Sequence, residues 1–500
     1  MNEDLRHYIS FVFGQGLRIV FATGGMAILA RFLGPDGLGR WAMITAYATL
    51  LHLALISWIQ QDPLLRFGKP EWVKSHRIRE TWSARLPIMG IGMLISILLF
   101  TVAPVSWTQR LFLLSRIDRA LAFCFLISII VTIEFQTLFQ TTERMMYLAF
   151  VPSVISGATF FFYLGLKLDN LSSHRLEISL LGTVFLTTVI WLGAGISQLK
   201  DIHVGFPPWN RTLVKTMLIF AWPILPTTML GYCVNWGSQI LIRHVFSSRD
   251  VGLYQVAFQV HSLIVSIAVP LTTITLPRLI GRHFEDPTVT KRYVNSIAPS
   301  LFCLWLTAAI PLVVILPTAF HIVFGRLYAN SVPILTAFLV CTPLCALGQL
   351  YTGLYTVQNN LGKIFVILVL MVCVNLAGVW VILPGANIRN FAFAFSTAFV
   401  FSQYLTYFYQ HHLLKEPTTK IHALLISAII FSLGQIFIYS LILRLAWGLA
   451  GLFLLIISTR LSDALDPAVL ERLFHGRLQP VNTFLTGLFI NPKIASDGTC

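Results

Sequence analysis

Apolar stretches of twenty or so residues recur along the whole chain, separated by short polar connectors. As helices, runs of ~20 residues are long enough to cross ~30 Å of hydrocarbon. The pattern therefore predicts an all-α polytopic membrane protein with about fourteen transmembrane helices. The expected spans are 8–33, 38–61, 86–107, 119–140, 146–168, 176–199, 213–242, 252–276, 296–320, 332–357, 364–384, 390–410, 421–443 and 445–459. The last is short for a full crossing, and Pro223 and Pro226 predict a kink in the seventh.

A weak internal repeat links the two halves of this pattern. An arginine at the end of an apolar run is followed at similar intervals by a glycine and then by a proline, and the pattern recurs about 212 residues later. The first copy uses Arg31, Gly39 and Pro63, and the second uses Arg243, Gly252 and Pro277. Internal repeats with a site between them at the membrane midplane are typical of transporters.

The repeat also suggests how the chain is divided. Residues 200–211 contain a glycine and two adjacent prolines, which favour a linker. We expect an N-terminal six-helix lobe at 1–199, a cytoplasmic linker at 200–211, a C-terminal six-helix lobe at 212–411, two further helices at 412–460 and a cytoplasmic tail at 461–500. Asp466 and Pro467 predict a short helix in that tail, lying on the membrane surface.

Composition and charge support the membrane interpretation. The chain is 56% hydrophobic and 11% charged, whereas a soluble protein carries about 25% charged residues. The net charge of +15 has a simple explanation, because membrane proteins keep Lys and Arg on their cytoplasmic loops. With a cytoplasmic N-terminus, 22 of these residues lie on the cytoplasmic side and 12 on the other, largely because of the 61–85 loop. Both termini are therefore expected in the cytoplasm, and no nucleic-acid partner is expected.

Enzyme and metal-site motifs are absent from the sequence. There is no phosphate-binding loop, no HExxH and no GxSxG elbow. We therefore expect no enzyme activity, no cofactor and no metal. The cysteines inside apolar runs form no CxxC pair and are interpreted as small packing residues. These cysteines are Cys124, Cys233, Cys303, Cys341, Cys345 and Cys373.

One cation lies deep in the first span. Arg18 is on the order of 15 Å from the N-terminal end of its helix, too deep for its side chain to reach the interface easily. A buried arginine in lipid costs several kcal/mol at least, so we expect it to face a polar cavity or a partner. Gln15, Ala22 and Gly25 share its face of the helix. A deep cation favours a substrate with an anionic group.

Four apolar spans also carry polar stripes at helical spacing. Each stripe has two explanations: hydrogen bonds between helices, worth ~0.6 kcal/mol each, or a shared hydrated cavity. The stripes are Thr45, Thr49 and His52; Thr228, Tyr232, Asn235 and Gln239; Gln255, Gln259, Ser262 and Ser266; and Cys345, Gln349, Thr352 and Thr356. Together with Arg18 they favour the cavity. The residues expected to line it are Gln15, Arg18, Arg31, Asn235, Gln239, Arg243, Gln255 and Gln259.

Several of these ionisable residues keep two interpretations. Arg31 and Arg243 lie near helix ends, where their side chains can simply extend to the interface. Glu134, the acid well inside a span, either pairs with a cation or takes part in ion coupling. His52 and His261 are either hydrogen-bonded helix residues or proton relays.

Three motifs resemble a known family: residues 28–39 (ILARFLGPDGLG), residues 324–328 (FGRLY), and residues 359–363 (NNLGK) leading through Asn375 to Gly385. They are similar to the polysaccharide transporters of the multidrug/oligosaccharidyl-lipid/polysaccharide exporter superfamily, in particular the Wzx-type O-antigen flippases. The resemblance covers roughly residues 8–460. It implies two pseudo-symmetric six-helix lobes, two further helices, and a central cavity that opens alternately to each side.

The resemblance also implies a function. The substrate would be an undecaprenyl-pyrophosphate-linked oligosaccharide, moved from the inner to the outer leaflet of the bacterial inner membrane for O-antigen, capsule or exopolysaccharide assembly. Arg18 suits the pyrophosphate, and the connector at Gly34, Pro35 and Asp36 suits a gate. The second copy has 246–250 (FSSRD) at that position, so the two halves are not expected to gate alike. Membrane lipid, a polysaccharide polymerase and chain-length proteins are the implied partners.

Two other functions remain open from the sequence. A cation or drug exporter of the same superfamily would favour acids in the cavity, where only Glu134 is available. A membrane polysaccharide polymerase or glycosyltransferase would need a sizeable outer loop with carboxylates or histidines, and every outer loop here is short.

Overall fold

The computed structural model describes residues 3–102, 105–169, 174–202, 210–268, 279, 286, 288–357, 361–382, 385, 387–414, 419–438, 440–473 and 479–490. Regular structure within these ranges is helical throughout, without a strand. Ten of the described helices are long and apolar enough to cross a membrane, or eleven when one bent pair counts as a single span. The prediction of an all-α polytopic membrane protein is confirmed.

The first expected span and most of the second form α1 (Glu3–His52), which consists of two helices that meet at a break at Gly34. Gly34 has φ 69° and ψ 174°, a conformation that a residue with a side chain rarely adopts. Pro35 follows directly and has no backbone N–H to continue the helix. The break therefore falls inside the connector that the sequence predicts at residues 34–37.

The remaining helices of the N-terminal half follow the sequence with one shift. They are η1 (Leu53–Ser57), α2 (Trp58–Gln60), η2 (Leu64–Gly68), α3 (Lys69–Ser75), α4 (Glu80–Val102), α5 (Val105–Phe112), α6 (Arg116–Thr141), α7 (Met145–Leu168) and α8 (Arg175–Ile202). The span expected at 86–107 is wrong at its start, because α4 already begins at Glu80. Arg85, assigned from the sequence to a loop, is buried within α4.

The C-terminal half begins with a broken helix. α9 (Arg211–Ala221) stops before Pro223, and α10 (Ile224–Val245) begins after it, so the predicted proline kink is confirmed. The other elements are α11 (Ser248–Ser266), α13 (Thr288–Arg292), η3 (Tyr293–Ile297), α14 (Ala298–Phe324), η4 (Arg326–Tyr328), α15 (Ser331–Leu339), α16 (Thr342–Val357), α17 (Leu361–Ile382) and α18 (Ile388–Leu414). The helices α15 and α16 meet at a bend of 48°.

The end of the chain differs from the sequence prediction in two places. The last two spans turn near residue 440 and not near 444, giving α19 (Thr419–Phe437) and α20 (Leu441–Ser462). At 22 residues, α20 is long enough to cross a membrane. The expected tail helix is present as α21 (Pro467–Leu473), and a second one, α22 (Gln479–Phe489), follows it.

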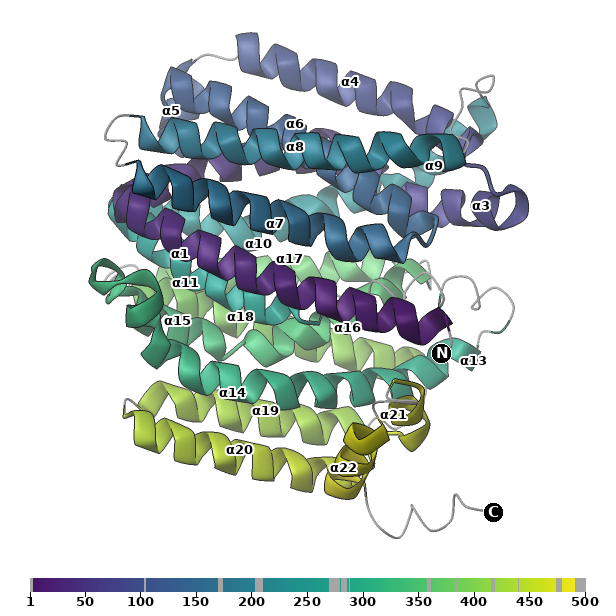
Figure 1. Ribbon diagram of the computed structural model, residues 1–500, viewed down its shortest axis with the longest axis vertical. Coiled ribbons are helices and arrows are strands. Elements are labelled where there is room, and N and C mark those ends of the chain that lie inside the picture. The colour runs from purple at the N-terminus through teal and green to yellow at the C-terminus, as the bar shows by residue number, and fades with distance from the viewer. Residues whose placement is uncertain are drawn as a thin grey trace.

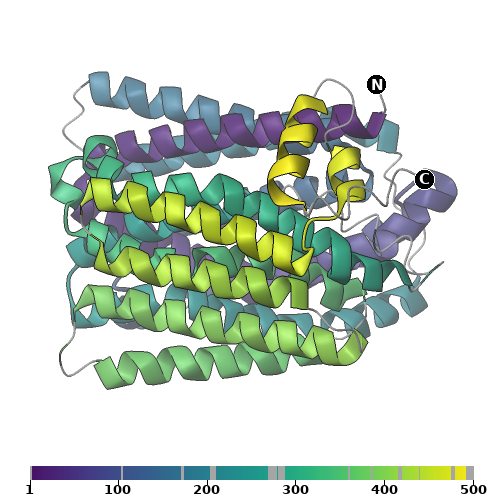
Figure 2. The same ribbon diagram turned by 90° about the horizontal axis from the view of Figure 1, so that it is seen from below.

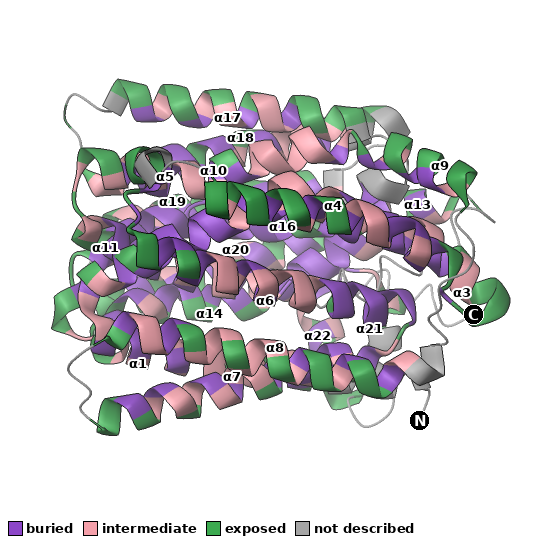
Figure 3. Cartoon of the chain, turned by 90° about the horizontal axis from the view of Figure 1, so that it is seen from above, coloured by how far each residue is buried: buried purple, intermediate pink, exposed green. Residues whose placement is uncertain are grey.

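The long helices run side by side along one direction (Figure 1). The N-terminus lies at the same end as α3, α13, α21 and α22, and Figure 2 agrees. Buried residues concentrate in the interior, whereas outer helices such as α4 and α17 expose much of their surface (Figure 3). Those exposed positions are apolar: Leu94 and Val102 in α4, and Trp380 and Val381 in α17, are 57%, 74%, 77% and 73% exposed. A surface of this kind is suited to lipid.

The repeat glycines meet where the two halves of the chain contact each other. A Cβ on Gly39 of α1 would lie 1.9 Å from the carbonyl oxygen of Ser248, and a Cβ on Gly252 of α11 would lie 1.9 Å from that of Pro35. The two helices therefore cross with their backbones in contact, and each copy of the repeat supplies one of the glycines that permit this. The residue limits of the two lobes and the linker remain a prediction.

We predict that Gly39→Ala destabilises the protein because its methyl group meets the Ser248 carbonyl. Overpacking of this kind typically costs about 1–3 kcal/mol, and thermal unfolding in detergent should show it as a lower melting temperature. Gly193→Ala is the matched control, because a Cβ at that position in α8 has no atom within 4 Å. Equal melting temperatures for the two variants would contradict the close crossing.

Candidate functional site

The two halves are joined by hydrogen bonds around the break at Gly34. The Ser248 hydroxyl donates to the Asp36 carbonyl at 3.2 Å, and the Tyr328 hydroxyl donates to the Ala30 carbonyl at 2.8 Å. The guanidinium of Arg31 donates to the Ile322 carbonyl at 2.5 Å. These contacts join the two halves next to α15, which lies at the end of the molecule opposite to the N-terminus (Figure 1).

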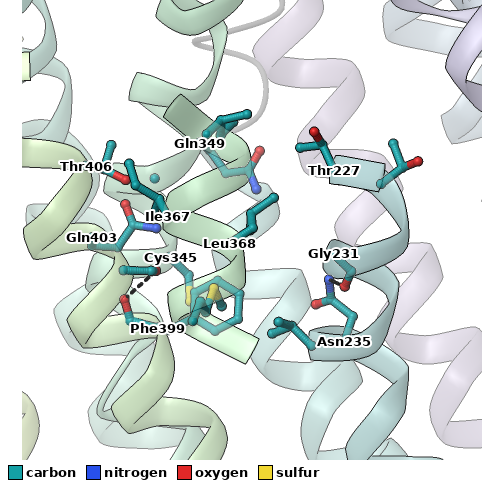
Figure 4. A pocket seen from close by; sticks show the side chains of 16 residues that line it. Thr227, Gly231, Asn235, Cys345, Gln349, Ile367, Leu368, Phe399, Gln403 and Thr406 are labelled. Carbon is teal, nitrogen blue, oxygen red and sulfur yellow. Dashed lines mark hydrogen bonds between the residues drawn. The ribbon is translucent and has the colours of Figure 1, made fainter. Parts of the chain in front are cut away.

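A cavity of about 250 Å³ lies in the C-terminal half, between α10, α16, α17 and α18 (Figure 4). Its polar lining comes from amides and hydroxyls on three of these helices, and α17 contributes apolar side chains. The polar residues are Thr227, Thr228, Asn235, Gln349, Ser402, Gln403 and Thr406. Ile367, Leu368, Met371 and Phe399 supply much of the apolar wall. No Asp, Glu, Lys, Arg or His is among the residues that line it.

The chemistry of this cavity follows from its lining. Side-chain amides and hydroxyls both donate and accept hydrogen bonds without carrying charge. Asn235 already donates to the Gly231 carbonyl at 2.8 Å, which fixes the direction of its amide. In Figure 4 the Gln349 and Thr227 side chains point into the space from opposite walls. The arrangement suits a neutral polar group, such as a hydroxylated ring, or water.

Two of the predicted polar stripes meet at this cavity. Thr228 and Asn235 from the seventh span and Cys345 and Gln349 from the tenth all line it. The sequence analysis did not identify the polar residues that the twelfth expected span, α18, contributes to the cavity. Ser402, Gln403 and Thr406 lie within two helical turns there, the same signal that identified the other stripes.

The remaining residues expected in a cavity lie elsewhere. Arg18 is half-buried in α1, and its guanidinium donates to the Gln15 side chain at 3.3 Å. Arg31 is exposed at the contact between the halves, and Arg243 is half-buried near the end of α10. Of the eight predicted cavity residues, only Asn235 lines the described cavity.

Three predicted glutamines are buried or half-buried without lining this cavity. Gln239 is fully buried one turn beyond Asn235, and neither atom of its amide has a hydrogen-bond partner within the described part of the protein. Gln255 in α11 is 4% exposed with an unpaired Oε1, and Gln259 is half-buried. Unpaired buried amides are costly, so Gln239 and Gln255 are places where water or a ligand group would be bound favourably.

A buried polar network occupies the N-terminal half. The Arg85 guanidinium of α4 forms an ion pair with Glu134 of α6 at 2.6 Å and also donates to the Gln60 carbonyl. That carbonyl is available because α2 is a short helix between the π-helical turns η1 and η2. Arg85 is 1% exposed and Glu134 is 8% exposed. Of the two interpretations of Glu134, pairing with a cation is therefore observed, and ion coupling stays a prediction.

His52 belongs to the same network. Its Nε2 lies 2.8 Å from Oε1 of Gln60, whose Nε2 in turn donates to the Ile130 carbonyl at 2.7 Å. Since an amide oxygen only accepts, the His52 Nε2 carries the proton and donates it to Gln60. Gln60 therefore contacts both residues: its side chain accepts from His52, and its backbone carbonyl accepts from Arg85.

Comparison with known proteins places the sequence in context. Residues 5–283, more than half of the chain, match the model of a family described as "Polysaccharide biosynthesis protein". No protein in a search of the curated proteins matches the chain.

Several solved structures are similar to this fold. The lipid II flippase MurJ in an inward closed conformation has a TM-score of 0.58 and 14% identity, over 91% of this chain and 97% of MurJ. The MATE transporter VcmN of Vibrio cholerae has a TM-score of 0.56 and 13% identity, over 83% of this chain and 98% of VcmN. The MATE multidrug transporter DinF-BH has a TM-score of 0.56 and 13% identity, over 82% of this chain and 96% of DinF-BH. At such low identity the likeness establishes a shared multi-pass membrane fold.

We predict that Glu134→Ala strongly destabilises the protein, because it leaves the Arg85 guanidinium buried without its counter-charge. Removing one partner of a buried ion pair costs about 3–5 kcal/mol. Chemical unfolding of the detergent-solubilised protein measures this loss, and the double variant Arg85→Met/Glu134→Leu should recover most of it. A Glu134→Ala variant as stable as the parent would show that the pair is not structural.

Proposed function

Because this chain belongs to the polysaccharide biosynthesis protein family, we propose that it is a flippase for undecaprenyl-pyrophosphate-linked oligosaccharides. It moves them from the inner to the outer leaflet of the bacterial inner membrane, for assembly of O-antigen, capsule or exopolysaccharide. The protein acts by alternating access and not as an enzyme, and no cofactor is needed. The fold shared with a lipid II flippase supports a lipid-linked substrate.

The observation that carries this proposal is the guanidinium of Arg18. It lies halfway along a span, it is half-buried, and among the described residues it donates a hydrogen bond to the neutral Gln15, with no carboxylate within ion-pair distance. A cation without a protein counter-charge at membrane depth is stabilised by an anionic ligand. An arginine also matches phosphate oxygens in charge and in geometry. The pyrophosphate of the lipid-linked substrate supplies such a ligand.

The sugar portion of the substrate requires a different environment. The cavity between α10, α16, α17 and α18 offers amides and hydroxyls with an aromatic side chain, Phe399, among its walls. This chemistry suits sugar hydroxyls, and Gln239, one turn beyond Asn235 in α10, provides further hydrogen-bonding capacity. We propose that headgroup and sugar are held in separate places: the charge by Arg18, and the neutral part by the C-terminal half.

The contacts around Gly34, Pro35 and Asp36 support a gate at the end of the molecule opposite to the N-terminus. With cytoplasmic termini, as the charge bias predicts, this end faces outward and the described conformation is closed to the outside. Transport then requires the α1–α11 crossing to separate. The hydrogen bonds from Ser248, Tyr328 and Arg31 are the contacts that would break.

The alternative functions have less support. A cation or drug exporter needs an acid free to bind its substrate, but Glu134 is paired with Arg85, and the lining of the described cavity has no carboxylate. A polymerase or glycosyltransferase needs an acid–base pair outside the membrane. The described outer connectors at Gly34 and at residues 113–115 are short.

We predict that Arg18→Ala abolishes surface polysaccharide while the protein remains in the membrane, because the pyrophosphate loses its counter-charge. Lipid-linked units should accumulate on the inner leaflet. Immunoblotting of surface polysaccharide and leaflet-specific labelling measure both effects. Arg18→Lys should retain part of the activity.

Arg116→Ala, which removes an exposed cation at the start of α6, is the matched control and should leave polysaccharide unchanged. Normal polysaccharide in Arg18→Ala cells would refute the role of Arg18. Accumulation of lipid-linked units on the outer leaflet would instead favour a polymerase.

We also predict that cross-linking the closed gate stops transport. In the double variant Asp36→Cys/Ser248→Cys, a short thiol-reactive cross-linker should join α1 to α11 and abolish surface polysaccharide, and a reductant that cleaves the linker should restore it. Each single-cysteine variant treated in the same way is the control. Unchanged export in the cross-linked double variant would contradict movement at this crossing.

A further inference from the structure

Three metal-ligand side chains from distant parts of the sequence meet inside the C-terminal half. A ring nitrogen of His261 and the Sγ atoms of Cys341 and Cys345 all lie within 4.8 Å of one another. All three residues are buried, at 3%, 0% and 5% exposure. His261 comes from α11, Cys341 from the bend between α15 and α16, and Cys345 from α16.

The hydrogen bonds of His261 select the form of imidazole that binds metals. Its Nδ1 lies 2.8 Å from the Thr342 hydroxyl, and that hydroxyl donates to the Phe338 carbonyl at 3.1 Å. A hydroxyl has one proton to donate, so it accepts from His261, and the ring proton is on Nδ1. The lone pair of this neutral imidazole is then on Nε2. Metal-binding histidines are typically held in this way, with the other ring nitrogen donating to a neighbouring group.

The surroundings determine what charge the cluster can hold. The His261 ring stacks on Phe338 at 5.4 Å, lies tilted against Phe258 at 6.0 Å and makes an edge contact with Phe395 at 6.2 Å. A net charge among such apolar rings is expensive. Two thiolates and a neutral imidazole balance a divalent cation, and thiolate with imidazole is a donor set preferred by thiophilic metals. We propose that His261, Cys341 and Cys345 bind a thiophilic d¹⁰ cation, with Zn²⁺ favoured by charge balance.

Binding follows a simple proton balance. Each thiol gives up one proton to solvent and forms one metal–sulfur bond, while His261 contributes its lone pair and loses no proton. The thiol of Cys341, which donates to the Phe338 carbonyl at 3.3 Å, loses that hydrogen bond. Ligand atoms in a tetrahedral zinc site lie roughly 3.5 Å apart, so a small contraction of the cluster is enough.

The site adjoins the cavity described above, so water can serve as the fourth ligand of the metal. Cys345 also lines the cavity of about 250 Å³, so the open coordination position is within reach of water from that cavity (Figure 4). Cys341 lies at the 48° bend between α15 and α16. A bound metal therefore joins α11 to the bend and to α16, which forms one wall of the cavity.

Metal binding to the full-length protein in detergent tests this proposal. After incubation with Zn²⁺ or with Cu⁺ and removal of free metal, the parent protein should retain about one ion per chain. Cys341→Ser/Cys345→Ser and His261→Gln should each lose most of it. Cys303→Ser is the matched control, because Cys303 is an equally buried thiol of the same half that contacts the Thr459 hydroxyl.

Co²⁺ gives a readout that a packing role cannot produce. The parent protein should develop thiolate-to-cobalt charge-transfer absorption, and the double-serine variant should not. Absence of these bands in the parent, or equal retention of every ion by the parent and the double variant, would overturn the proposal. Because the first of these outcomes needs only the parent protein, misfolding of a variant does not affect it.

Discussion

The dominant constraint on this protein is the absence of water across its hydrocarbon-spanning region. Each polar group there must find a partner within the protein, and most of the described ones do so within their own helix. Where a helix is interrupted, the freed groups are used by other residues. The interrupted second span exposes the Gln60 carbonyl, which accepts from Arg85, and Arg85 in turn neutralises Glu134. The same constraint identifies the exceptions, because an unpaired polar group at this depth needs a ligand.

These exceptions are unevenly distributed between the halves. The N-terminal half pairs its buried charges and presents the cation of Arg18 with a neutral neighbour. The C-terminal half contains the neutral polar cavity, the unpaired amides of Gln239 and Gln255, and the cluster around His261. A substrate with a charged headgroup and a neutral sugar would meet different chemistry in each half. The two halves thus differ in their buried polar chemistry.

Close backbone contact connects the two halves. Gly39 and Gly252 occupy corresponding positions in the repeat, and each permits the other half's carbonyl to approach. Hydrogen bonds between the halves include Ser248 to Asp36 at this crossing and Tyr232 to the Ala46 carbonyl farther along α1. The α1–α11 crossing and these hydrogen bonds therefore hold the two halves together at the break in α1 and farther along that helix.

The sequence by itself determined the class of the protein, the approximate spans, the break at residues 34–37 and the proline kink before α10. These features are local, because span length and glycine and proline conformations depend on neighbouring residues. Polar stripes likewise identified Asn235 and Gln349, but not which helices they face. Only the tertiary structure paired Arg85 with Glu134, brought α18 to the cavity and left Arg18 outside it. It alone assembled His261 with Cys341 and Cys345, where cysteine spacing predicted packing residues. The reason is physical: a helix fixes which side chains share its own face, whereas packing across distant segments decides what that face meets.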